Sequence, residues 1–404
     1  MKVTGTARDQ GRRNILFVDH AASPGGGQLA LLWLLERSSR MRPTVVFLAD
    51  GPVAARLRAA GVDVRVLYPG RAFERKMLIV ALPKLFRIIR ESRPDAVVAM
   101  SAAVVKTLAM IPFGSIPSLA YLQEDLERVR DRGLVTEIIF RLVYPAFDGL
   151  MANSEWTAST IPASLSEIPR SVTYPPSNVP GIPPDEAVST FPREGTVRIA
   201  AFSRPERWKG LDILVDALGI VKAERPRADF RLDLYGGGLV GDAGYVTDLR
   251  RSLEQAPFPA EMHGHVDDVP VRMASTDVLV LPSRLPEPFG QVIAQGLAHG
   301  CVVVVSDQGG AVEQIVANRN GLVFEPRSAR SLADQIERLL DDRASADGLL
   351  REARAVFTTF GDPQLADRFE AELESLIDHI RRDGAAPMSS RRLRRRVRLL
   401  LRRA

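Results

Sequence analysis

Cysteine is almost absent from this chain, which has one in 404 residues. The single thiol, Cys301, excludes disulfides within the chain, and we expect it to be a buried core residue. Long hydrophobic runs are also missing, since no apolar stretch approaches the roughly 20 residues of a membrane-spanning helix. The segment 1–13 is polar and a strand-like run follows at once at Ile15–Val18, so no secretory signal is expected. These absences predict a cytoplasmic protein.

The rest of the composition is typical of a globular protein, with 46% hydrophobic and 25% charged residues. A chain of this length has enough residues for two or three domains. The net charge of +5 is unevenly distributed, because eight arginines lie between Arg391 and Arg403. Such a basic run favours an anionic surface or a polyanionic ligand.

Strand-like runs alternate with helical patterns in both halves of the chain, which predicts doubly wound parallel sheets of an α/β fold. The expected strands are Ile15–Val18, Thr44–Leu48, Val62–Leu67, Ala96–Ala99, Ser118–Leu122, Leu150–Asn153, Val197–Phe202, Phe230–Tyr235, Val278–Leu281 and Val302–Ser306. A proline-rich stretch separates the two halves and is typical of a linker. The expected divisions are an N-terminal extension (1–13), a first α/β domain (14–174), a linker (175–195), a second α/β domain (196–355), a terminal helix (356–384) and a basic tail (385–404).

The stretch from Val278 to Gly300 carries the strongest functional pattern. A buried strand ends at Pro282, prolines hold a turn around Glu287, and a helical pattern follows from Phe289 to His299. A helix that begins at Gly290 offers first-turn N–H groups and the positive end of its dipole, which attract phosphate.

Glu287 and Gln295 lie eight positions apart, a separation of about 12 Å along a helix. That is too long for the carboxylate pair of a glycosidase, which is roughly 5–10 Å apart. It suits two ends of one ligand: a nucleotide-diphosphate sugar with its hexose near Glu287, its diphosphate at the helix start and its ribose near Gln295. An ordinary strand, turn and helix with a surface glutamate is the alternative.

Glu-Pro-Phe-Gly with a polar residue eight positions after the glutamate resembles the signature of glycosyltransferase family 4. The resemblance implies a retaining, nucleotide-sugar-dependent transferase of GT-B architecture, in which two Rossmann-like domains face each other across a cleft. The family has a second glutamate where this chain has Gln295, whose amide can bond a ribose hydroxyl but brings no charge. The donor-binding residues implied are Phe289, Gly290, Gln291, Val292, Gln295 and, near the base, Val266.

Family members also carry an arginine and a lysine five positions apart after the first strand of the second domain. Arg204 and Lys209 match this spacing after Val197–Phe202. The resemblance implies that both cations stabilise the departing phosphate while Glu287 holds a sugar hydroxyl, which makes these three the expected catalytic residues. Ordinary surface cations are the alternative.

In the first half, a strand leads into a glycine loop and a helix, the entrance of a Rossmann-like unit. The loop is not the dinucleotide-binding pattern, and its glycines can equally serve a tight turn. The resemblance implies acceptor or cleft roles for Gly26, Gly27 and Gln28. Gln123 and Glu124 stand where many relatives have a His-Glu pair, so they are expected at the cleft too.

The reaction implied by the resemblance needs no protein nucleophile, metal or other cofactor, because the departing phosphate takes the proton of the acceptor hydroxyl. His263 and His265 could ligate a metal from one strand face, but no third ligand stands at a recognisable spacing. The expected partners are a nucleotide sugar and a glycan or lipid-linked acceptor. A catalytically silent subunit and a nucleotide-sugar epimerase are the alternatives.

The tail is the last element with a functional pattern. Its arginines and leucines predict a basic amphipathic segment at 391–403 that contacts an anionic surface, such as the inner face of the cell membrane. A disordered basic tail is the alternative. Nucleic acid is not expected, because aromatic stacking residues are missing around the arginines.

Overall fold

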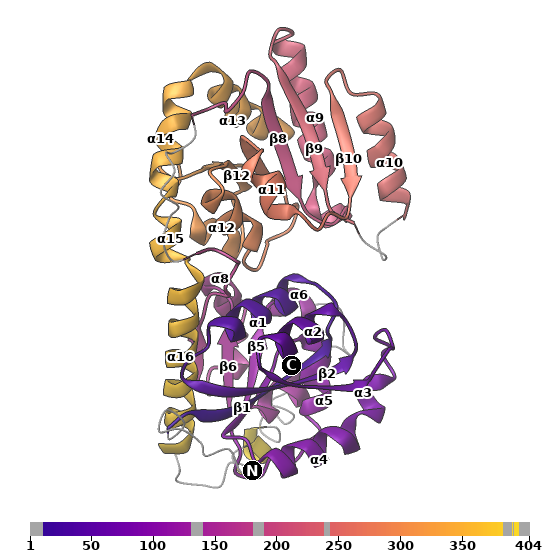
Figure 1. Ribbon diagram of the computed structural model, residues 1–404, viewed down its shortest axis with the longest axis vertical. Coiled ribbons are helices and arrows are strands. Elements are labelled where there is room, and N and C mark those ends of the chain that lie inside the picture. The colour runs from indigo at the N-terminus through magenta and orange to yellow at the C-terminus, as the bar shows by residue number, and fades with distance from the viewer. Residues whose placement is uncertain are drawn as a thin grey trace. The chain divides into compact units, whose positions relative to one another are not determined.

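The computed structural model describes residues 11–130, 140–180, 190–237, 243–382, 390 and 392–395. The chain forms two compact units (Figure 1). Unit 1 consists of Met1–Pro176 and Asp362–Ala404, and unit 2 is the continuous segment Ser177–Gly361. The backbone therefore passes from one unit to the other twice.

Unit 1 is built on a parallel sheet of seven strands in the order β3-β2-β1-β4-β5-β6-β7. The strands are β1 (Arg13–Ala21), β2 (Met41–Ala49), β3 (Asp63–Tyr68), β4 (Ala96–Ala99), β5 (Ser118–Leu122), β6 (Gly149–Ala152) and β7 (Arg170–Val172). The strand order reverses between β1 and β4, and the crevice at the carboxyl ends of such strands is where open α/β sheets bind ligands.

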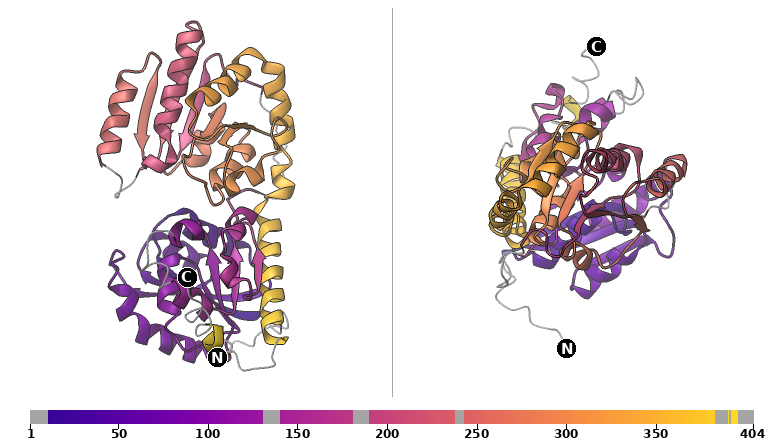
Figure 2. Two further views of the ribbon diagram at one scale, coloured as in Figure 1. Left: turned by 180° about the vertical axis from the view of Figure 1, so that it is seen from behind. Right: turned by 90° about the horizontal axis from the view of Figure 1, so that it is seen from above.

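Helices cover both faces of this sheet. They are α1 (Gly26–Arg37), α2 (Pro52–Ala59), α3 (Met77–Val80), α4 (Leu82–Ser92), α5 (Ala102–Leu108), α6 (Leu126–Arg130), α8 (Glu155–Ser159) and α16 (Asp362–Arg382). Helices α3, α4 and α5 bury their apolar residues on one face, whereas α1, α2 and α16 do so on the other. Phe369, Leu373 and Ile377 of α16 lie in that second core, so the C-terminal helix is part of unit 1 (Figures 1 and 2).

Unit 2 has a parallel sheet of six strands in the order β10-β9-β8-β11-β12-β13. The strands are β8 (Val197–Phe202), β9 (Phe230–Tyr235), β10 (Ala260–Gly264), β11 (Val278–Leu281), β12 (Val302–Ser306) and β13 (Leu322–Phe324). Its helices are α9 (Leu211–Glu224), α10 (Ala243–Glu254), α11 (Val269–Ala274), α12 (Gln291–Ala298), α13 (Ala329–Asp341), α14 (Arg343–Ala353) and α15 (Val356–Thr359). The strand order reverses between β8 and β11.

Several expected boundaries differ from those of the structure. Helix α12 begins at Gln291 rather than at Gly290, because Gly290 has a φ of 78° and is the N-cap. In the stretch expected to be a linker, Val179 and Phe191 are buried and Phe191 lies in the core of unit 2. The described ends of this proline-rich stretch are therefore packed, and residues 181–189 lie outside the described part.

The expected terminal helix (356–384) is divided between the units. Val356–Thr359 forms α15 in unit 2 and Asp362–Arg382 forms α16 in unit 1. Cys301 is buried, as expected, and burial raises the pKa of its thiol to about 12. The thiol is therefore protonated at neutral pH. No helix in the described ranges combines the length and the apolar character that crossing a bilayer requires.

Described residues of the basic tail pack against unit 1. Arg392 is buried and forms an ion pair with Asp148, whose Oδ2 also accepts the backbone N–H of Ser118 at 3.0 Å. Arg395 donates to the carbonyl oxygen of Phe147 at 2.7 Å. Ser118 is the first residue of β5 and Asp148 precedes β6, so this contact is at the amino edge of the sheet. Residues 396–404 lie outside the described part.

Candidate functional site

In unit 2 the sequence-predicted residues Lys209 and Glu287 meet where the strand order reverses. Lys209 follows β8 and Glu287 follows β11, and these two strands are neighbours in the sheet. The Nζ of Lys209 lies 2.9 Å from Oε1 and 2.7 Å from Oε2 of Glu287. Each side chain is only 13% exposed. A charge-assisted pair of this kind is strong, and its place at the carboxyl edge is that of a ligand site.

Neighbouring loops hold Glu287 through its backbone and its side chain. The backbone N–H of Gly310 donates to the Glu287 carbonyl at 2.8 Å, and Ser283 Oγ donates to its carboxylate at 3.1 Å. Gly309 has a φ of 77°, and a Cβ there would lie 2.5 Å from the carbonyl oxygen of Glu287. Only glycine therefore permits this approach between the loops after β11 and β12.

The loop that carries Lys209 is fixed in a similar way. Gly210 has a φ of 66°, and a Cβ there would lie 2.1 Å from the carbonyl oxygen of Pro282. The N–H of Arg284 donates to the carbonyl of Trp208 at 2.8 Å, and Lys209 Nζ lies 4.0 Å from the Trp208 ring centroid. The backbones of the two loops therefore set the position of the ammonium group.

The structure does not bring Arg204 to this pair. Its side chain is 59% exposed and its Nη1 lies 2.8 Å from Oε1 of Glu206. Glu206 also accepts a hydrogen bond from the indole N–H of Trp208. Arg204 thus lies in the same loop as Lys209 but is bound to a different carboxylate.

The residues around α12 that the sequence predicted differ in how deeply they are buried. Gly290, Gln291, Val292 and Gln295 are half-buried, at or near the first turns of the helix. Phe289 is 3% exposed and its ring packs against Phe360 at 6.2 Å between centroids. The ring of Phe289 is therefore part of the packing, and its carbonyl oxygen accepts a hydrogen bond from Gln314 Nε2 at 2.6 Å. Val266, half-buried, follows the end of β10.

The two histidines considered as metal ligands have different partners. His263 Nε2 lies 2.7 Å from Asp233 Oδ1, while His265 is 71% exposed and faces Asp267. In the described part of the chain, Asp233, Glu261 and His263 bring ligand-type atoms within 4.8 Å of one another. Arg231 donates to both oxygens of Asp233 at 2.9 and 2.7 Å. The Asp233 carboxylate that a metal would use is therefore hydrogen-bonded to the Arg231 guanidinium. The expected absence of a metal stays a prediction.

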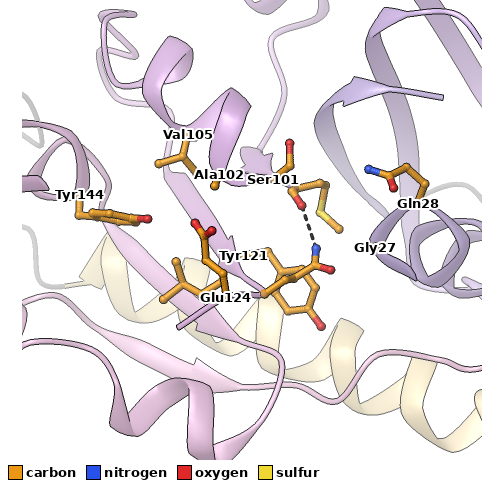
Figure 3. A pocket seen from close by; sticks show the side chains of 11 residues that line it. Gly27, Gln28, Ser101, Ala102, Val105, Tyr121, Glu124 and Tyr144 are labelled. Carbon is orange, nitrogen blue, oxygen red and sulfur yellow. Dashed lines mark hydrogen bonds between the residues drawn. The ribbon is translucent and has the colours of Figure 1, made fainter. Parts of the chain in front are cut away.

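In unit 1, four of the five predicted acceptor residues line one pocket: Gly27, Gln28, Gln123 and Glu124. It has a volume of about 170 Å³ and lies at the carboxyl ends of β4 and β5 and the start of α1 (Figure 3). The remaining lining residues are Met100, Ser101, Ala102, Val105, Tyr121, Leu122 and Tyr144. Gly26 is exposed beside it as the first residue of α1.

Close approaches within this pocket tie its two sides together. A Cβ at Gly27 would lie 2.7 Å from Gln123 Oε1, and Gln123 Nε2 donates to the Met100 carbonyl at 2.8 Å. Gln28 Nε2 donates to Oδ2 of Asp19 at 2.8 Å. Asp19 is fully buried and also accepts from the backbone N–H of His20 at 2.7 Å.

Ser101 and Tyr144 line the pocket and Asp19 is bonded to its lining residue Gln28, and the sequence did not reveal any of the three. Asp19 is in β1, Ser101 follows β4 and Tyr144 begins a short 3-10 helix after α6. None stands in a local motif. The place of Ser101 could have been inferred, because it follows an expected strand next to the reversal of strand order.

The carboxylate of Glu124 lies at one end of the pocket. Glu124 and Tyr144 lie side by side there, while Gly27 and Gln28 lie at the other end (Figure 3). Burial, and secondarily the charge of Glu124, raise the pKa of Tyr144 well above its usual value. The phenol is therefore neutral over the physiological range and keeps its donor hydrogen.

Residues 196–342 match the family model described as glycosyl transferases group 1. These residues contain Lys209, Glu287, α12 and the loops that hold them.

Residues 196–342 form a glycosyl transferases group 1 domain. The recognition of glycosyltransferase motifs in the second half of the chain is thereby confirmed. The domain is that of a sugar-transferring enzyme, and it begins with β8 and includes every strand of unit 2.

Curated relatives match mainly over part of their length. The D-inositol 3-phosphate glycosyltransferase of Pseudarthrobacter chlorophenolicus is 32% identical over 167 residues, 39% of this chain and 38% of that protein. The glycogen synthase of Mycobacterium tuberculosis is 30% identical over 175 residues, 43% of this chain and 41% of that protein. The match therefore spans about two-fifths of the length of these two relatives.

Solved structures match over nearly the whole chain. Anabaena HepE, in a crystal structure with UDP and glucose, has a TM-score of 0.74 at 23% identity, covering 90% of this chain and 100% of that one. Sucrose-phosphate synthase from Thermosynechococcus elongatus has a TM-score of 0.70 at 16% identity, covering 91% and 100%. At such identities the likeness shows the fold, and the expected GT-B fold is confirmed.

Proposed function

We propose that this protein is a retaining glycosyltransferase of family 4. It moves a hexosyl group from a nucleotide-diphosphate sugar to a hydroxyl of a glycan or lipid-linked acceptor, in polysaccharide or glycoconjugate synthesis. The observation that carries the proposal is the Lys209–Glu287 pair, which stands at the strand-order reversal inside the glycosyl transferases group 1 domain. The solved neighbour that holds UDP and glucose supports a nucleotide sugar as the donor.

The proposed roles follow from the chemistry of each group. Lys209 stabilises negative charge on the departing phosphate, and Glu287 both keeps the ammonium in place and accepts a sugar hydroxyl. The first-turn amides of α12 at Gln291 and Val292 receive the diphosphate, because a helix start attracts anions. Gln295 bonds the ribose. The phosphate itself takes the acceptor proton, so the proposal assigns no metal.

The test is a thermal-shift screen of the full chain with UDP-, GDP- and ADP-sugars. A donor that binds only the folded protein stabilises it by about 2.7 kcal/mol at 100 times Kd, and this stabilisation raises the melting temperature. Gln295→Glu restores the charge found in the family and is expected to increase the shift, because a charged acceptor makes the stronger hydrogen bond. Gln255→Glu, at the exposed end of α10, is the matched control. A screen with no shift for any donor contradicts the proposal.

A catalytically silent binding subunit is the second candidate. The neutral amides of Gln123 and Gln295, and the binding of Arg204 to Glu206, favour it. Slow hydrolysis of the donor identified by the screen separates the two functions. An active transferase releases free sugar from that donor, whereas a silent subunit binds it and releases none.

We further propose that the segment 391–403 of the basic tail contacts an anionic membrane, which places the protein at the inner face of the cell membrane. Arg392 and Arg395 are held by unit 1, so the proposed contact is assigned to the arginines after Arg395. Each cation near an anionic surface contributes about 1 kcal/mol. Co-sedimentation is expected with phosphatidylglycerol vesicles and not with phosphatidylcholine vesicles. Equal binding to both, or binding that survives truncation after Arg395, contradicts this placement.

A further inference from the structure

The turn that precedes α12 is hydrogen-bonded to one buried side chain, that of Gln314. This residue ends the short 3-10 helix Gly310–Gln314, which follows β12, and it is 2% exposed. Its Nε2 donates to the carbonyl oxygen of Phe289 at 2.6 Å and to that of Gly290 at 3.2 Å. One amide group therefore binds two successive peptide carbonyls directly before α12.

The two carbonyls fix which way the amide group of Gln314 faces. If the amide were turned over, its Oε1 would meet two carbonyl oxygens, and acceptors that face each other repel. With the nitrogen toward the carbonyls, Oε1 is buried and has no hydrogen-bond partner among the described residues. An unpaired buried acceptor destabilises a fold, and an apolar side chain of similar length would not have one. Packing alone therefore does not favour a glutamine at this position.

The bonds to the carbonyls also set the direction of the N–H groups in the turn. In a trans peptide the C=O and the N–H point in opposite directions. The N–H groups of Gly290 and Gln291 share their peptides with the two bound carbonyls, so both point away from Gln314. Gly290 has a φ of 78° and a ψ of 63°, and the first helical residue follows it. A left-handed residue next to a right-handed one arranges successive N–H groups into a concave nest that binds anions.

The same 3-10 helix holds the other end of this loop. The N–H of Gly310 donates to the Glu287 carbonyl at 2.8 Å, so the helix binds the loop at its start and, through Gln314, at its end. In the proposed orientation of the donor, the hexose lies near Glu287 and the diphosphate lies at the start of α12. The phosphate nearer the sugar then meets the turn at Gly290.

From these contacts we infer that Gln314 is a positioning residue for the donor. It holds the turn at Phe289 and Gly290 so that the amides face the phosphate nearer the sugar, and it thereby makes the site prefer a nucleoside diphosphate to a nucleoside monophosphate. Gln314 itself is buried and acts only through the turn. The inference rests on the proposed function, because it takes the start of α12 as the diphosphate site.

The experiment is isothermal titration calorimetry of the full chain with UDP, GDP and ADP, each compared with its monophosphate. The unaltered protein should bind one of the diphosphates more tightly than the matching monophosphate. Gln314→Met keeps the length of the side chain and removes the donor. We expect it to weaken the diphosphate about tenfold, as for the loss of one hydrogen bond to a charged group, and the monophosphate less than about twofold. A purely structural role would weaken both ligands alike.

Gln308→Met is the matched control, because it makes the same substitution in the loop before this 3-10 helix. The Nε2 of Gln308 donates to the Ser283 carbonyl at 2.7 Å and to Ser306 Oγ at 3.1 Å, and neither group belongs to the turn before α12. This variant should therefore leave the ratio of the diphosphate and monophosphate affinities unchanged. Circular dichroism and melting temperature check the folding of every variant.

Two further variants test whether Gln314 acts through the turn. Gly290→Ala disturbs the turn directly, because alanine is strained at a φ of 78°. Gln314→Met should then add little to the effect of Gly290→Ala, since residues that act through one contact are not additive. Gln314→Asn keeps the amide but shortens its reach by one methylene. It should weaken the diphosphate in the same direction, also if the methionine variant fails to fold.

Three results overturn the inference. Gln314→Met and Gln314→Asn both fail to fold, a folded variant leaves the ratio of the two affinities unchanged, or the effect of Gln314→Met adds fully to that of Gly290→Ala. If one of these occurs while the unaltered protein binds a diphosphate, the transferase proposal stands and Gln314 has only a structural role. If the unaltered protein binds none of the diphosphates, the proposed function itself fails and the inference fails with it.

Discussion

Each unit holds a tightly packed ion pair, but the two pairs lie at opposite edges of their sheets. In unit 2, Lys209 and Glu287 meet at the carboxyl edge, where each side chain is still 13% exposed. In unit 1, Arg392 and Asp148 meet at the amino edge, where the side chains are 9% and 1% exposed. The first pair is reachable by a ligand and the second is sealed.

Because of this difference we expect the two ion pairs to have different roles, one in the transfer reaction and the other in the stability of the fold. Ligands of open α/β sheets bind at the carboxyl ends of the strands, so a pair placed there can exchange partners with a substrate. A pair at the amino edge stands away from that crevice and ties the basic tail to the fold. We therefore expect removal of Lys209 to lower the rate of transfer strongly without unfolding the chain, and removal of Asp148 to weaken the fold without stopping transfer.

The largest effect is expected from Lys209→Ala. Loss of one group that stabilises transition-state charge lowers kcat by about 100- to 1,000-fold. Initial rates of sugar transfer measure this, with circular dichroism and melting temperature as the check on folding. Lys222→Ala on α9, whose ammonium donates to the Ala228 carbonyl at 2.8 Å, is the matched control and should retain activity.

Lys209→Ala removes the cation and also leaves the Glu287 carboxylate without its partner, and a double variant distinguishes these two effects. Lys209→Met with Glu287→Gln removes both charges, so no unpaired charge remains in the loop. It should fold like the unaltered protein and still fail to transfer sugar. Activity recovered in this double variant would show that Lys209 serves only to neutralise Glu287.

Asp148→Asn tests the ion pair of unit 1, and we expect it to lower stability and not activity. Removing one partner of a buried pair leaves the other charge uncompensated and costs about 3 kcal/mol. Urea unfolding followed by tryptophan fluorescence measures the loss, since Trp33 and Trp156 lie in unit 1. Transfer below the unfolding transition should be unchanged. Adding Arg392→Met to Asp148→Asn should recover part of the stability, and no recovery would show that the pair is not what Asp148 stabilises.

The smallest effect is expected from a pair of glycine substitutions that compares the two sites. Gly309→Ala places a Cβ 2.5 Å from a backbone carbonyl at a φ of 77°, which costs about 1–3 kcal/mol. Gly27→Ala places a Cβ 2.7 Å from the side-chain amide of Gln123, which can turn away. The melting temperature should therefore fall further for Gly309→Ala. Equal falls would show that the unit 1 pocket is as rigid as the unit 2 loops.

Much of the fold could be predicted because buried parallel strands are short, continuous apolar runs. Ala96–Ala99, Ser118–Leu122, Val197–Phe202, Phe230–Tyr235, Val278–Leu281 and Val302–Ser306 have the bounds that the structure gives. β7 was missed, since Arg170–Val172 is three residues long and mostly polar. α12 was predicted one residue too early, because a sequence pattern does not distinguish a left-handed N-cap glycine from the first helical residue.

The candidate site was predictable only where its residues lie in one motif or follow one strand. Lys209 and Glu287 were each identified, but their ion pair joins positions 78 residues apart, and no local pattern carries that information. Asp19 was missed for a different reason. It stands inside a strand where an apolar residue is the rule, and its partners Gln28 and His20 become visible only when the chain has folded.

The two crossings of the backbone, at Pro176–Ser177 and Gly361–Asp362, make unit 2 a single insertion into unit 1. A truncation that ends the chain at Gly361 leaves all of unit 2 but removes α16, and with it Phe369, Leu373 and Ile377 from the unit 1 core. Unit 1 can be produced alone only by joining residue 176 to residue 362 through a designed connection, whereas 177–361 can be excised as one continuous piece.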